Sequence, residues 1–434
     1  MSQPLLAIYS ALIPAVAALA RAAGRLSPPL GEFFAVRRGV HAALATKCAA
    51  VEAGRPRLWV HAASVGEFEQ ARPIITELKR SVPGLAVFVS FLSESGYSAR
   101  RDYPDAEAVF YLPADTPANA KRTVELVRPD LFMLMRYDFW PSHLLALKRH
   151  GARMILAAAV LQEGSGYFNP LLKGFYRELF GLFDRIFTVG GKDERAFREV
   201  FGCTTAERAG EPRIDQVIRR STNSAGKTAG LRHVFSDRSV LVAGSVWEKD
   251  EEVVLGAWLQ TVDRPSLVLV PHKVGRENIL RIERELEAMA VPFRKVSEPD
   301  VRLDPSREVL LVDETGYLVE LYSIATLAYV GGGFGVNVHN TLEPAVYGIP
   351  VMFGPRHHNS PEAEGLLEAG GACVVGNIAE MKAALERLRK GSFASAEAGR
   401  ASYRFIHDQA GATETIADAA RQALSPGMSG RQAR

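Results

Sequence analysis

The amino-acid sequence predicts an α/β protein made of two Rossmann-like domains. Short apolar stretches alternate with amphipathic ones along most of the 434 residues, and a repeated strand–helix order favours a parallel sheet covered on both faces. This alternation stops in a polar stretch at residues 219–237 and then starts again. With 47% hydrophobic residues, the chain is also long enough to form two cores of ordinary size.

The composition excludes several classes of protein. The formal net charge is only +3, which gives no reason to expect a nucleic-acid partner. The three cysteines, Cys48, Cys203 and Cys373, are scattered, odd in number and without CxxC spacing. This usage argues against a disulfide framework or a cysteine metal site, and it suits a reducing compartment.

The N-terminal segment, residues 1–22, is strongly apolar. No charge occurs from Met1 to Ala20, and the basic residues Arg21 and Arg25 follow the apolar run, whereas a cleaved signal peptide has them ahead of it. The run is somewhat shorter than the ~20 residues of a membrane span. We therefore expect an uncleaved anchor or an interfacial helix, with its arginines on the cytoplasmic side. The alternative is a soluble helix that packs on the body of the protein.

The first domain, residues 23–218, has its first strand at residues 58–63. The strand breaks at Ser64 and Gly66 and leads into a helix, so that Glu67 lies on the carboxyl side of a strand, where α/β folds place their sites. A glutamate in a first helical turn is also favourable for the helix dipole alone. A serine hydrolase is excluded, because the first glycine of a nucleophile elbow is missing.

Strand and helix patterns alternate through the rest of this domain. Strands are expected at residues 85–91, 108–112, 131–135, 154–160 and 185–189, and helices at 93–103, 117–127, through 144 and 147, at 171–183 and around 197. The segment after the third of these strands carries Arg136 and Asp138.

A linker is expected at residues 219–237, which are rich in Ser, Thr, Asn, Gly and Arg. The second domain, residues 238–400, repeats the pattern of the first. Strands are expected at residues 239–243, 267–270 and 309–312, a loop at 244–247, and helices at 277–289, 317–324 and 381–388. Residues 394–424 read as helical. Within 401–434 we expect a C-terminal helix that returns towards the first domain, followed by a tail.

Residues 329–355 are the most informative part of the second domain. A strand ending at Val330 passes into a glycine run, a helix is expected to open near Asn340, and a strand at 350–353 closes the unit. Glycines let the backbone approach a ligand closely, and a helix start aims N–H groups at a phosphate. Glu343 offers acceptor oxygens to a pair of ribose hydroxyls. Glycine turns also connect strands to helices without a ligand, but the HNTLEP motif favours a nucleotide-sugar site.

The adjacent histidines His357 and His358 are not expected to bind a metal. Neighbouring side chains point in different directions from one backbone, and no third ligand is spaced for them in the sequence. The pair is therefore interpreted as part of the surface.

Four motifs occur in order along essentially the whole chain. They are WVHAASVGEF at residues 59–68, FWP at 139–141, AGS at 243–245, and HNTLEP with GIPVMFGP within 339–355. Together they resemble the 3-deoxy-D-manno-octulosonic acid (Kdo) transferases, GT-B glycosyltransferases of lipid A and lipopolysaccharide inner-core synthesis. The resemblance implies two Rossmann-like domains that face each other across a cleft. It also implies an inverting, metal-independent enzyme that moves Kdo from CMP-Kdo to a lipid A precursor (lipid IVA) at the cytoplasmic face of the inner membrane.

The resemblance assigns the general base to Glu67 of the S-x-GE motif. Such a base takes the proton of the acceptor hydroxyl as this attacks the anomeric carbon. Ser64 and Gly66 of the same motif, together with Arg136 and Asp138, are expected on the acceptor side. Many members of the family carry an acid where this chain has Arg136, so any acceptor-side role of that acid stays open, although Asp138 keeps an acid nearby.

CMP leaves as a phosphate monoester dianion, so cationic and N–H groups suffice to stabilise it and no general acid is required. The donor-binding candidates are Arg213, Ser245, His272, Lys273, Gly332, Gly333, Asn340 and Glu343. Of these, Arg213 is expected to pair with the Kdo carboxylate or the phosphate, and Glu343 to hold the ribose. Many members have Pro-Arg-His where this chain has Pro-His-Lys at 271–273, so positive charge is retained. Neither a metal nor another cofactor is expected.

The expected partners are CMP-Kdo, the lipid A precursor and the lipid surface of the inner membrane, which the basic Arg37 and Arg38 suit electrostatically. Two rival functions stay open. One is another GT-B transferase or epimerase that uses a UDP-sugar, and calorimetry with CMP and UDP separates it. The other is a catalytically silent, membrane-associated binding protein that keeps the nucleotide fold, and a transfer assay with a Glu67→Gln variant separates that one.

Overall fold

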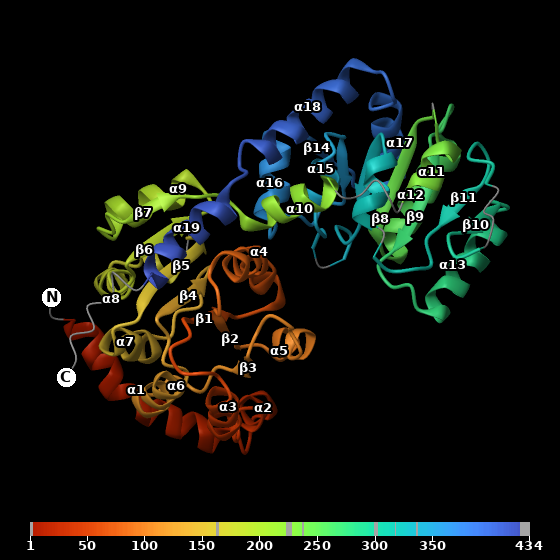
Figure 1. Cartoon of the computed structure of the whole chain (residues 1–434). Coiled ribbons are helices and arrows are strands. Elements are labelled where there is room, and N and C mark those ends of the chain that lie inside the picture. Colours follow the sequence, from red (N-terminus) through yellow and green to blue (C-terminus); the bar gives the residue numbers. More distant parts are fainter. Residues whose placement is uncertain are drawn as a thin grey trace. The chain divides into compact units, whose positions relative to one another are not determined.

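The computed structural model describes residues 3–161, 165–222, 228–236, 238–298, 303–316, 318–335 and 337–425. The chain divides into two compact units, unit 1 with Met1–Asp215 and Ala410–Arg434, and unit 2 with Gln216–Gln409. Each unit contains one seven-stranded parallel sheet with helices packed on it (Figure 1). The predicted pair of Rossmann-like domains and the N-terminal apolar helix are therefore confirmed.

The sheet of unit 1 has the strand order β3-β2-β1-β4-β5-β6-β7. Its strands are β1 (Arg57–Ala62), β2 (Ala86–Phe91), β3 (Ala108–Tyr111), β4 (Leu131–Met135), β5 (Arg153–Ala159), β6 (Arg185–Thr188) and β7 (Ala206–Arg208). The order reverses at β1, which pairs in parallel with both β2 and β4. Open α/β sheets bind ligands at the carboxyl ends of the two strands that flank such a reversal.

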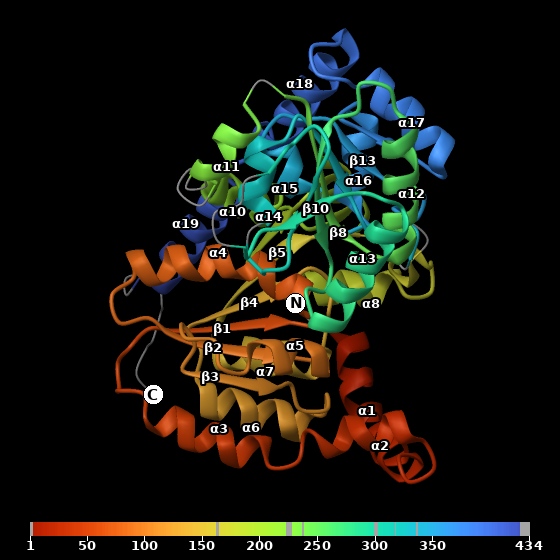
Figure 2. The same ribbon diagram turned by 90° about the vertical axis from the view of Figure 1, so that its right-hand side faces the viewer.

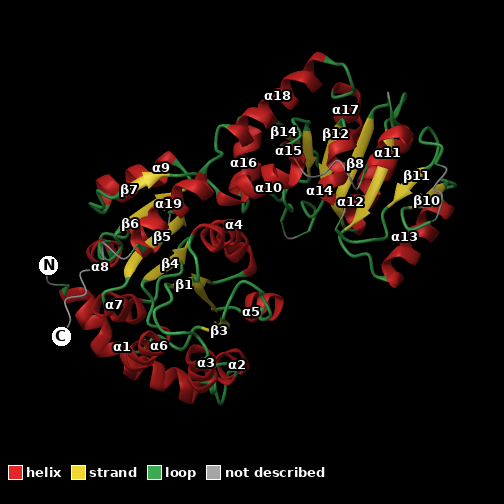
Figure 3. Cartoon of the chain, viewed as in Figure 1, coloured by secondary structure: helices red, strands yellow, loops and turns green. Residues whose placement is uncertain are grey.

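Helices cover both faces of this sheet (Figure 3). They are α1 (Pro4–Ala23), α2 (Pro28–Ala35), α3 (Val40–Ala49), α4 (Val65–Ser81), α5 (Glu94–Arg100), α6 (Pro117–Val127), α7 (Pro141–His150), α8 (Lys173–Phe180), α9 (Gly191–Arg195) and α19 (Ala412–Leu424), with a 3₁₀ turn at Gly166–Phe168 and a π turn at Ala196–Val200. Helix α10 (Pro212–Thr222) runs from unit 1 into unit 2.

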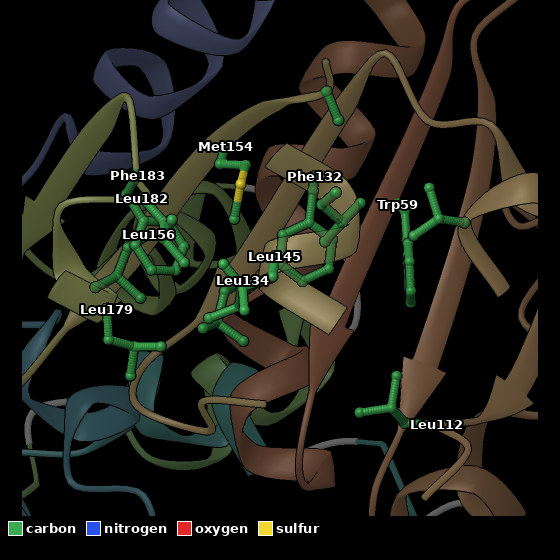
Figure 4. Packing of buried hydrophobic residues seen from close by; sticks show 14 of the residues in the cluster. Trp59, Leu112, Phe132, Leu134, Leu145, Met154, Leu156, Leu179, Leu182 and Phe183 are labelled. Atoms are coloured by element: carbon green, nitrogen blue, oxygen red, sulfur yellow. The ribbon is translucent and has the colours of Figure 1, made fainter. Parts of the chain in front are cut away.

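Two apolar cores enclose the sheet of unit 1, because successive side chains of a strand point to opposite faces. From β1, Trp59 joins one core with side chains of α6, α7 and α8 (Figure 4), and Val60 joins the other with side chains of α4 and α19. Both are fully buried, as is typical of parallel strands that are covered on two sides. The last helix of the chain, α19, thus completes the core of unit 1.

Helix α1 packs against α2, α7 and α8, with Leu6 fully buried. Its other side is exposed and apolar, and it carries Leu5, Ile8, Leu12, Val16 and Leu19. Among the helices that the structure describes, α1 is the one that is long and apolar enough to cross a membrane by length and composition, a test that core helices of soluble proteins also pass.

The sheet of unit 2 has the strand order β10-β11-β9-β8-β12-β13-β14. Figure 2 labels β8, β10 and β13 of this sheet. Its strands are β8 (Val240–Val246), β9 (Ser266–Pro271), β10 (Phe293–Lys295), β11 (Val309–Leu311), β12 (Leu327–Val330), β13 (Val351–Phe353) and β14 (Ala372–Val374). Here the order reverses at β8, which pairs in parallel with β9 and β12. The glycine run predicted to bind a nucleotide follows β12 directly.

The helices of unit 2 flank this sheet. They are α11 (Ala229–Val234), α12 (Glu248–Gln260), α13 (Arg276–Ala288), α14 (Leu318–Leu321), α15 (Leu342–Ala345), α16 (Pro361–Glu368), α17 (Ile378–Arg387) and α18 (Phe393–His407), with a 3₁₀ turn at Tyr322–Ile324. The predicted helix at 317–324 is α14 followed directly by this 3₁₀ turn, and its first residue, Tyr317, lies outside the described residues.

Three expectations about secondary structure are corrected. Residues 244–246 are not a loop, because β8 continues to Val246 across a register shift, with Ser245 at φ +54°. The helical run predicted at 394–424 is two helices, α18 and α19, separated at Gly411, whose φ of +101° ends helical geometry. Helix α10 continues through Thr222 into the stretch predicted to be a linker, of which residues 223–227 and 237 lie outside the described residues.

Glycines allow the loop after β12 to lie directly on the neighbouring strand ends. A Cβ atom on Gly331 would lie 2.2 Å from the carbonyl oxygen of Ser245 at the end of β8. A Cβ atom on Gly333 would lie 2.7 Å from the backbone of Gly354 after β13. Both distances are far below van der Waals contact, so no side chain fits at either position without backbone movement.

We expect Gly333→Ala to destabilise unit 2 by about 1–3 kcal/mol, the usual cost of forcing extra atoms into a packed site. Urea unfolding followed by circular dichroism measures the change. Gly335→Ala is the matched control, because a Cβ atom there meets only the carbonyl oxygen of Gly332 at 3.4 Å. Equal losses of stability in the two variants would contradict the packing role of Gly333.

Candidate functional site

In unit 1, Glu67 lies in the first turn of α4, directly after β1. Ser64 caps this helix, and its Oγ accepts a hydrogen bond from the backbone N–H of Glu67 at 3.4 Å. The carboxylate turns back, and its Oε2 accepts from the N–H of Ala63 at 2.5 Å. Gly66 lies between the two capping residues, where a Cβ atom would meet only the Ser64 hydroxyl, at 3.9 Å. The S-x-GE motif therefore shapes the helix start, and only 7% of Glu67 is exposed.

Burial raises the pKa of Glu67 above its ordinary value of 4.5, and the negative charge of Asp138 raises it further. The Ala63 N–H, His61 and Arg136 act in the opposite direction without cancelling the shift. A carboxylate with a raised pKa is a stronger base, which suits a group that must accept a proton near neutral pH.

Asp138 follows β4 and has the opposite shift. Burial alone would raise its pKa, but its contacts with His61 and Trp140 lower it below 3.8. Its Oδ2 lies 2.9 Å from His61 Nε2 and accepts a hydrogen bond from Trp140 Nε1 at 2.8 Å. The other ring nitrogen of His61, Nδ1, lies 2.8 Å from Ser90 Oγ. Two neighbouring carboxyl groups with pKa values pushed apart are typical of acid–base sites.

Arg136 also follows β4, where its backbone has the unusual φ of +61°. Its guanidinium donates to Gln70 Oε1 at 2.9 Å and to Glu211 Oε2 at 3.3 Å. Arg213 donates to the same buried carboxylate, with its Nε 3.1 Å from Glu211 Oε1. Two arginines therefore donate to the same carboxylate. Backbone conformations of this kind concentrate at functional sites.

Arg213 stands apart from the other donor-binding candidates. It belongs to unit 1 and lies with Arg136, which was expected on the acceptor side, whereas the remaining seven candidates belong to unit 2. Arg213 was counted among the donor-binding candidates because it resembles a basic position of the transferase family. Glu211 and Gln70, which hold the two arginines, were missed by sequence reasoning, although Glu211 stands in the same GEPR segment.

In unit 2, a cavity of about 290 Å³ opens between the ends of β8 and β12. Its walls bring together three of the predicted donor-binding residues, Ser245, Asn340 and Glu343. It also includes Arg220, Tyr322 and His339, which were not predicted as donor-binding residues. Burial raises the pKa of Glu343, although Arg220 and a hydrogen bond from Asn340 Nδ2 to Glu343 Oε1 of 3.1 Å oppose the shift.

The predicted phosphate cradle at Gly332 and Gly333 stays a prediction, and the structure shows which of its groups already have partners. The N–H of Gly332 donates to Oδ2 of the buried Asp250 at 2.9 Å, so it is not available to a ligand. Gly333 packs against the backbone of Gly354. Helix α15 has only four residues, and its first N–H, on Leu342, donates to Asn340 Oδ1. The glycine run thus positions the loop through close packing, and the N–H of Gly332 is used within the protein.

His272 and Lys273 follow β9 and lie beside two further aromatic rings. The ring of His272 stacks between Trp247 and His339, with centroids 4.5 Å and 4.4 Å away. Trp247 Nε1 donates to His339 Nε2 at 2.9 Å. Partial burial and the charge of Lys273 lower the pKa of His272, so the expected positive charge at this loop comes from Lys273 alone near pH 7. Sequence reasoning missed Trp247, although it stands directly at the end of β8.

His357 and His358 do not point away from each other as expected. Their Nδ1 atoms lie 2.7 Å and 2.8 Å from the same oxygen, Oε1 of Glu364 in α16. These three groups are close enough to hold a metal ion by distance, and Glu364 is the third group that the sequence spacing did not reveal. The contacts equally form a hydrogen-bonded cluster. Burial is the largest single effect on the pKa of Glu364 and raises it, but the contacts with His357 and His358 together lower this pKa below its ordinary value.

We expect Glu67→Gln to gain stability relative to the native protein as the pH rises. Between the ordinary pKa of 4.5 and the raised pKa, the unfolded chain has released its proton while the folded protein still holds it, so the native protein loses stability with rising pH. Glutamine removes this loss and keeps an oxygen that accepts from Ala63 N–H. Thermal melts from about pH 4 to about pH 7 measure the difference. The exposed Glu52→Gln is the control, and an equal trend in both variants would contradict the burial effect.

Comparison with known proteins places these features in a family. A model of the family described as "3-Deoxy-D-manno-octulosonic-acid transferase (kdotransferase)" matches residues 36–216. A 3-deoxy-D-manno-octulosonic acid transferase of Aquifex aeolicus is 31% identical over 73% of this chain and 80% of its own length. One from Haemophilus influenzae is 26% identical over 83% of this chain and 86% of its own length.

Solved structures support the fold. A UDP-GlcNAc 2-epimerase of Neisseria meningitidis bound to UDP-GlcNAc superposes with a TM-score of 0.57 at 15% identity, covering 84% of this chain and all of the epimerase chain. A protein from Listeria monocytogenes described as a UDP-N-acetylglucosamine 2-epimerase gives a TM-score of 0.52 at 13% identity, over 86% of this chain and 97% of its own. At this identity the likeness concerns the fold alone. The relatives of higher identity decide the family, and the chain belongs to the 3-deoxy-D-manno-octulosonic acid transferases, which are glycosyltransferases.

Proposed function

We propose that the protein transfers Kdo from CMP-Kdo to the lipid A precursor (lipid IVA) in lipopolysaccharide biosynthesis, with inversion at the anomeric carbon. The observation that carries this proposal is the pair of carboxyl groups, Glu67 and Asp138, that flank the strand reversal of unit 1 with opposite pKa shifts. Membership of the transferase family supports the choice of the transferred sugar.

In the proposed reaction, Glu67 is the general base. A hydroxyl oxygen of the acceptor attacks the anomeric carbon while the hydroxyl proton moves to the Glu67 carboxylate. The bond from the anomeric carbon to the phosphate oxygen breaks, and CMP takes the bonding electron pair. Asp138 stays ionised because His61 and Trp140 stabilise its charge, so it does not compete for this proton but raises the basicity of Glu67.

On the acceptor side, we assign Ser64 and Gly66 to shaping the loop that presents Glu67, and Arg136 to binding an anionic group of the acceptor. Arg136 and Arg213 both donate to the carboxylate of Glu211, and guanidinium groups suit the recognition of a phosphate or carboxylate.

On the donor side, we assign the cavity of unit 2 to CMP. Glu343 and Asn340 offer an acceptor and a hydrogen-bonded neighbour for the ribose hydroxyls, and Ser245 lines the same cavity. Arg220 and Lys273 supply the positive charge for the phosphate, whereas Gly332 and Gly333 act only by placing the loop. This scheme uses cationic side chains to stabilise the leaving group and takes no metal.

We further propose that the enzyme lies on the cytoplasmic face of the inner membrane. In the described part of unit 1, every exposed large apolar side chain lies on α1, on α2, in the turn between them or just before α8: Leu5, Ile8, Leu12, Val16, Leu19, Leu26, Leu30, Leu171 and Leu172. Helix α1 is also held to the protein near its N-terminal end, with Leu6 buried and Tyr9 bonded to Asp115. This favours a helix that lies in the membrane interface over one that leaves the protein to span the bilayer.

We expect Glu67→Gln to lower kcat for transfer by roughly 10²–10⁴-fold, the usual contribution of a general base, with little change in KM. The native pH–rate profile should rise with pH through a pKa above the usual glutamate range, because the base must be deprotonated. Product masses measured with CMP-Kdo and the tetraacylated precursor provide the rate. The control is Glu69→Gln on the same helix, whose carboxylate binds Arg72 and Arg100. Near-native transfer by Glu67→Gln would exclude Glu67 as the base.

We expect the native protein to bind CMP in calorimetry and to show no comparable affinity for UDP. Glu343→Gln should weaken CMP binding roughly tenfold to hundredfold, because a hydrogen bond to a charged group is lost. Glu277→Gln, an exposed position on α13, is the matched control. Tighter binding of UDP would favour a UDP-sugar enzyme of the same fold, and binding of CMP without any transfer would favour a silent binding protein.

A further inference from the structure

A second cavity, of about 570 Å³, lies in unit 1 beside the N-terminal helix. It follows the groove between the neighbouring helices α6 and α7, and Ser10 of α1 closes one side of it. Its apolar wall consists of Pro117, Ala118, Val124, Leu145 and Ala146. None of its lining residues belongs to the Glu67 cluster described above, so this cavity is not part of the proposed catalytic site.

The cavity has a basic rim. Lys121 of α6 and Arg149 of the last turn of α7 line it together with His150. Glu125 also lines it and lies 3.7 Å from Lys121, a distance at which an exposed pair contributes little. Within the described residues, Arg149 has no carboxylate partner. The rim therefore carries net positive charge next to an apolar wall.

One polar group in the wall has no partner. Only 3% of Ser142 is exposed, it lines the cavity, and its Oγ makes no hydrogen bond within the described structure, although its N–H is bound by Asp115. A buried hydroxyl without a partner is costly. A ligand oxygen in the cavity would remove that cost.

We infer that this cavity binds one anionic glycerophospholipid of the membrane. The phosphate would lie at Lys121 and Arg149, an acyl chain along the apolar wall towards α1, and an ester oxygen would accept from the Ser142 hydroxyl. The inference rests on the proposed membrane association, because α1 brings the bilayer surface to the cavity. The lipid site is additional to the proposed membrane association, because α1 could adsorb to a membrane without binding any particular lipid.

The shape and charge of the cavity favour a lipid over a free anion. The rim offers two cations to a phosphate, but most of the wall is apolar and would gain nothing from a small hydrophilic ion. Ser10 lies on the packed side of α1, and the exposed stripe Leu5, Ile8, Leu12, Val16 and Leu19 lies on its other side, so that a lipid in the cavity would lie beneath the helix whose outer side is proposed to contact the membrane.

The inference is tested on the full-length protein by calorimetry with dihexanoyl phosphatidylglycerol, a water-soluble anionic phospholipid, and with glycerol phosphate as the headgroup probe. We expect the native protein to bind the lipid and not the headgroup. Arg149→Glu should weaken lipid binding about tenfold by reversing a charge at the rim. Ala146→Trp should abolish it by filling the groove, while it leaves the charge unchanged. Lys47→Glu on α3, outside the cavity, controls for net charge and should bind like the native protein.

Two further measurements separate this inference from the proposed function. Co-sedimentation with vesicles of phosphatidylcholine, with or without phosphatidylglycerol, reports membrane binding, and Ala146→Trp should still bind because α1 is intact. Thermal melts show that each variant is folded. No binding of the soluble lipid by the native protein, or equal binding by Ala146→Trp, overturns the lipid site even if transfer activity is intact. Equal binding of glycerol phosphate would mean an anion site instead.

Discussion

The parallel pairing of one central strand with two neighbours sets the position of everything else in each unit. In unit 1 this strand is β1, between β2 and β4, and in unit 2 it is β8, between β9 and β12. The strand order reverses at these central strands, so that the connections on their two sides run over opposite faces of the sheet. This leaves the carboxyl ends of the strands open to a ligand. Glu67 and Asp138 follow the two strands at the first reversal, and Ser245 and the glycine loop lie at the second.

The electrostatics of unit 1 depend on how each carboxylate is solvated by the protein. Glu67 receives one backbone N–H and little else, so burial dominates and its pKa rises. Asp138 receives Trp140 and the ring of His61, so its charge is stabilised and its pKa falls. The capping geometry at the start of α4 therefore also leaves the buried Glu67 carboxylate with few hydrogen-bond donors. The proposed catalytic role of Glu67 is compatible with its structural role, because both follow from its position in the first turn.

Patterns of local origin were predictable from the sequence, and contacts between distant segments were not. The helix at 117–127 and the strand at 131–135 were expected within their observed limits, because apolar spacing and a proline at the helix start act locally. Strands β7, β10 and β14 were not predicted, because their three residues are only partly buried and form no apolar run, whereas the equally short β11 and β13 are fully buried and were predicted. The donor-side role of Arg213 was predicted from its likeness to a position of the family. The contact that brings Arg213 to Arg136 through Glu211 joins segments far apart in the sequence, so the sequence pattern did not reveal it.

The glycine run illustrates why a motif predicts location better than chemistry. Its place after β12 was correct, but its N–H at Gly332 is bound by Asp250, whose carboxylate also accepts from Tyr329 OH and from the N–H of Trp247. This buried carboxylate occupies the position at which an anionic ligand was expected. Asp250 links the loop after β12 to the start of α12. In this arrangement His339 contacts Trp247, and Asn340 contacts Glu343. The negative charge of Asp250 inside the loop also disfavours a phosphate at Gly332, which is why the proposed donor site assigns the phosphate to the side-chain cations Arg220 and Lys273.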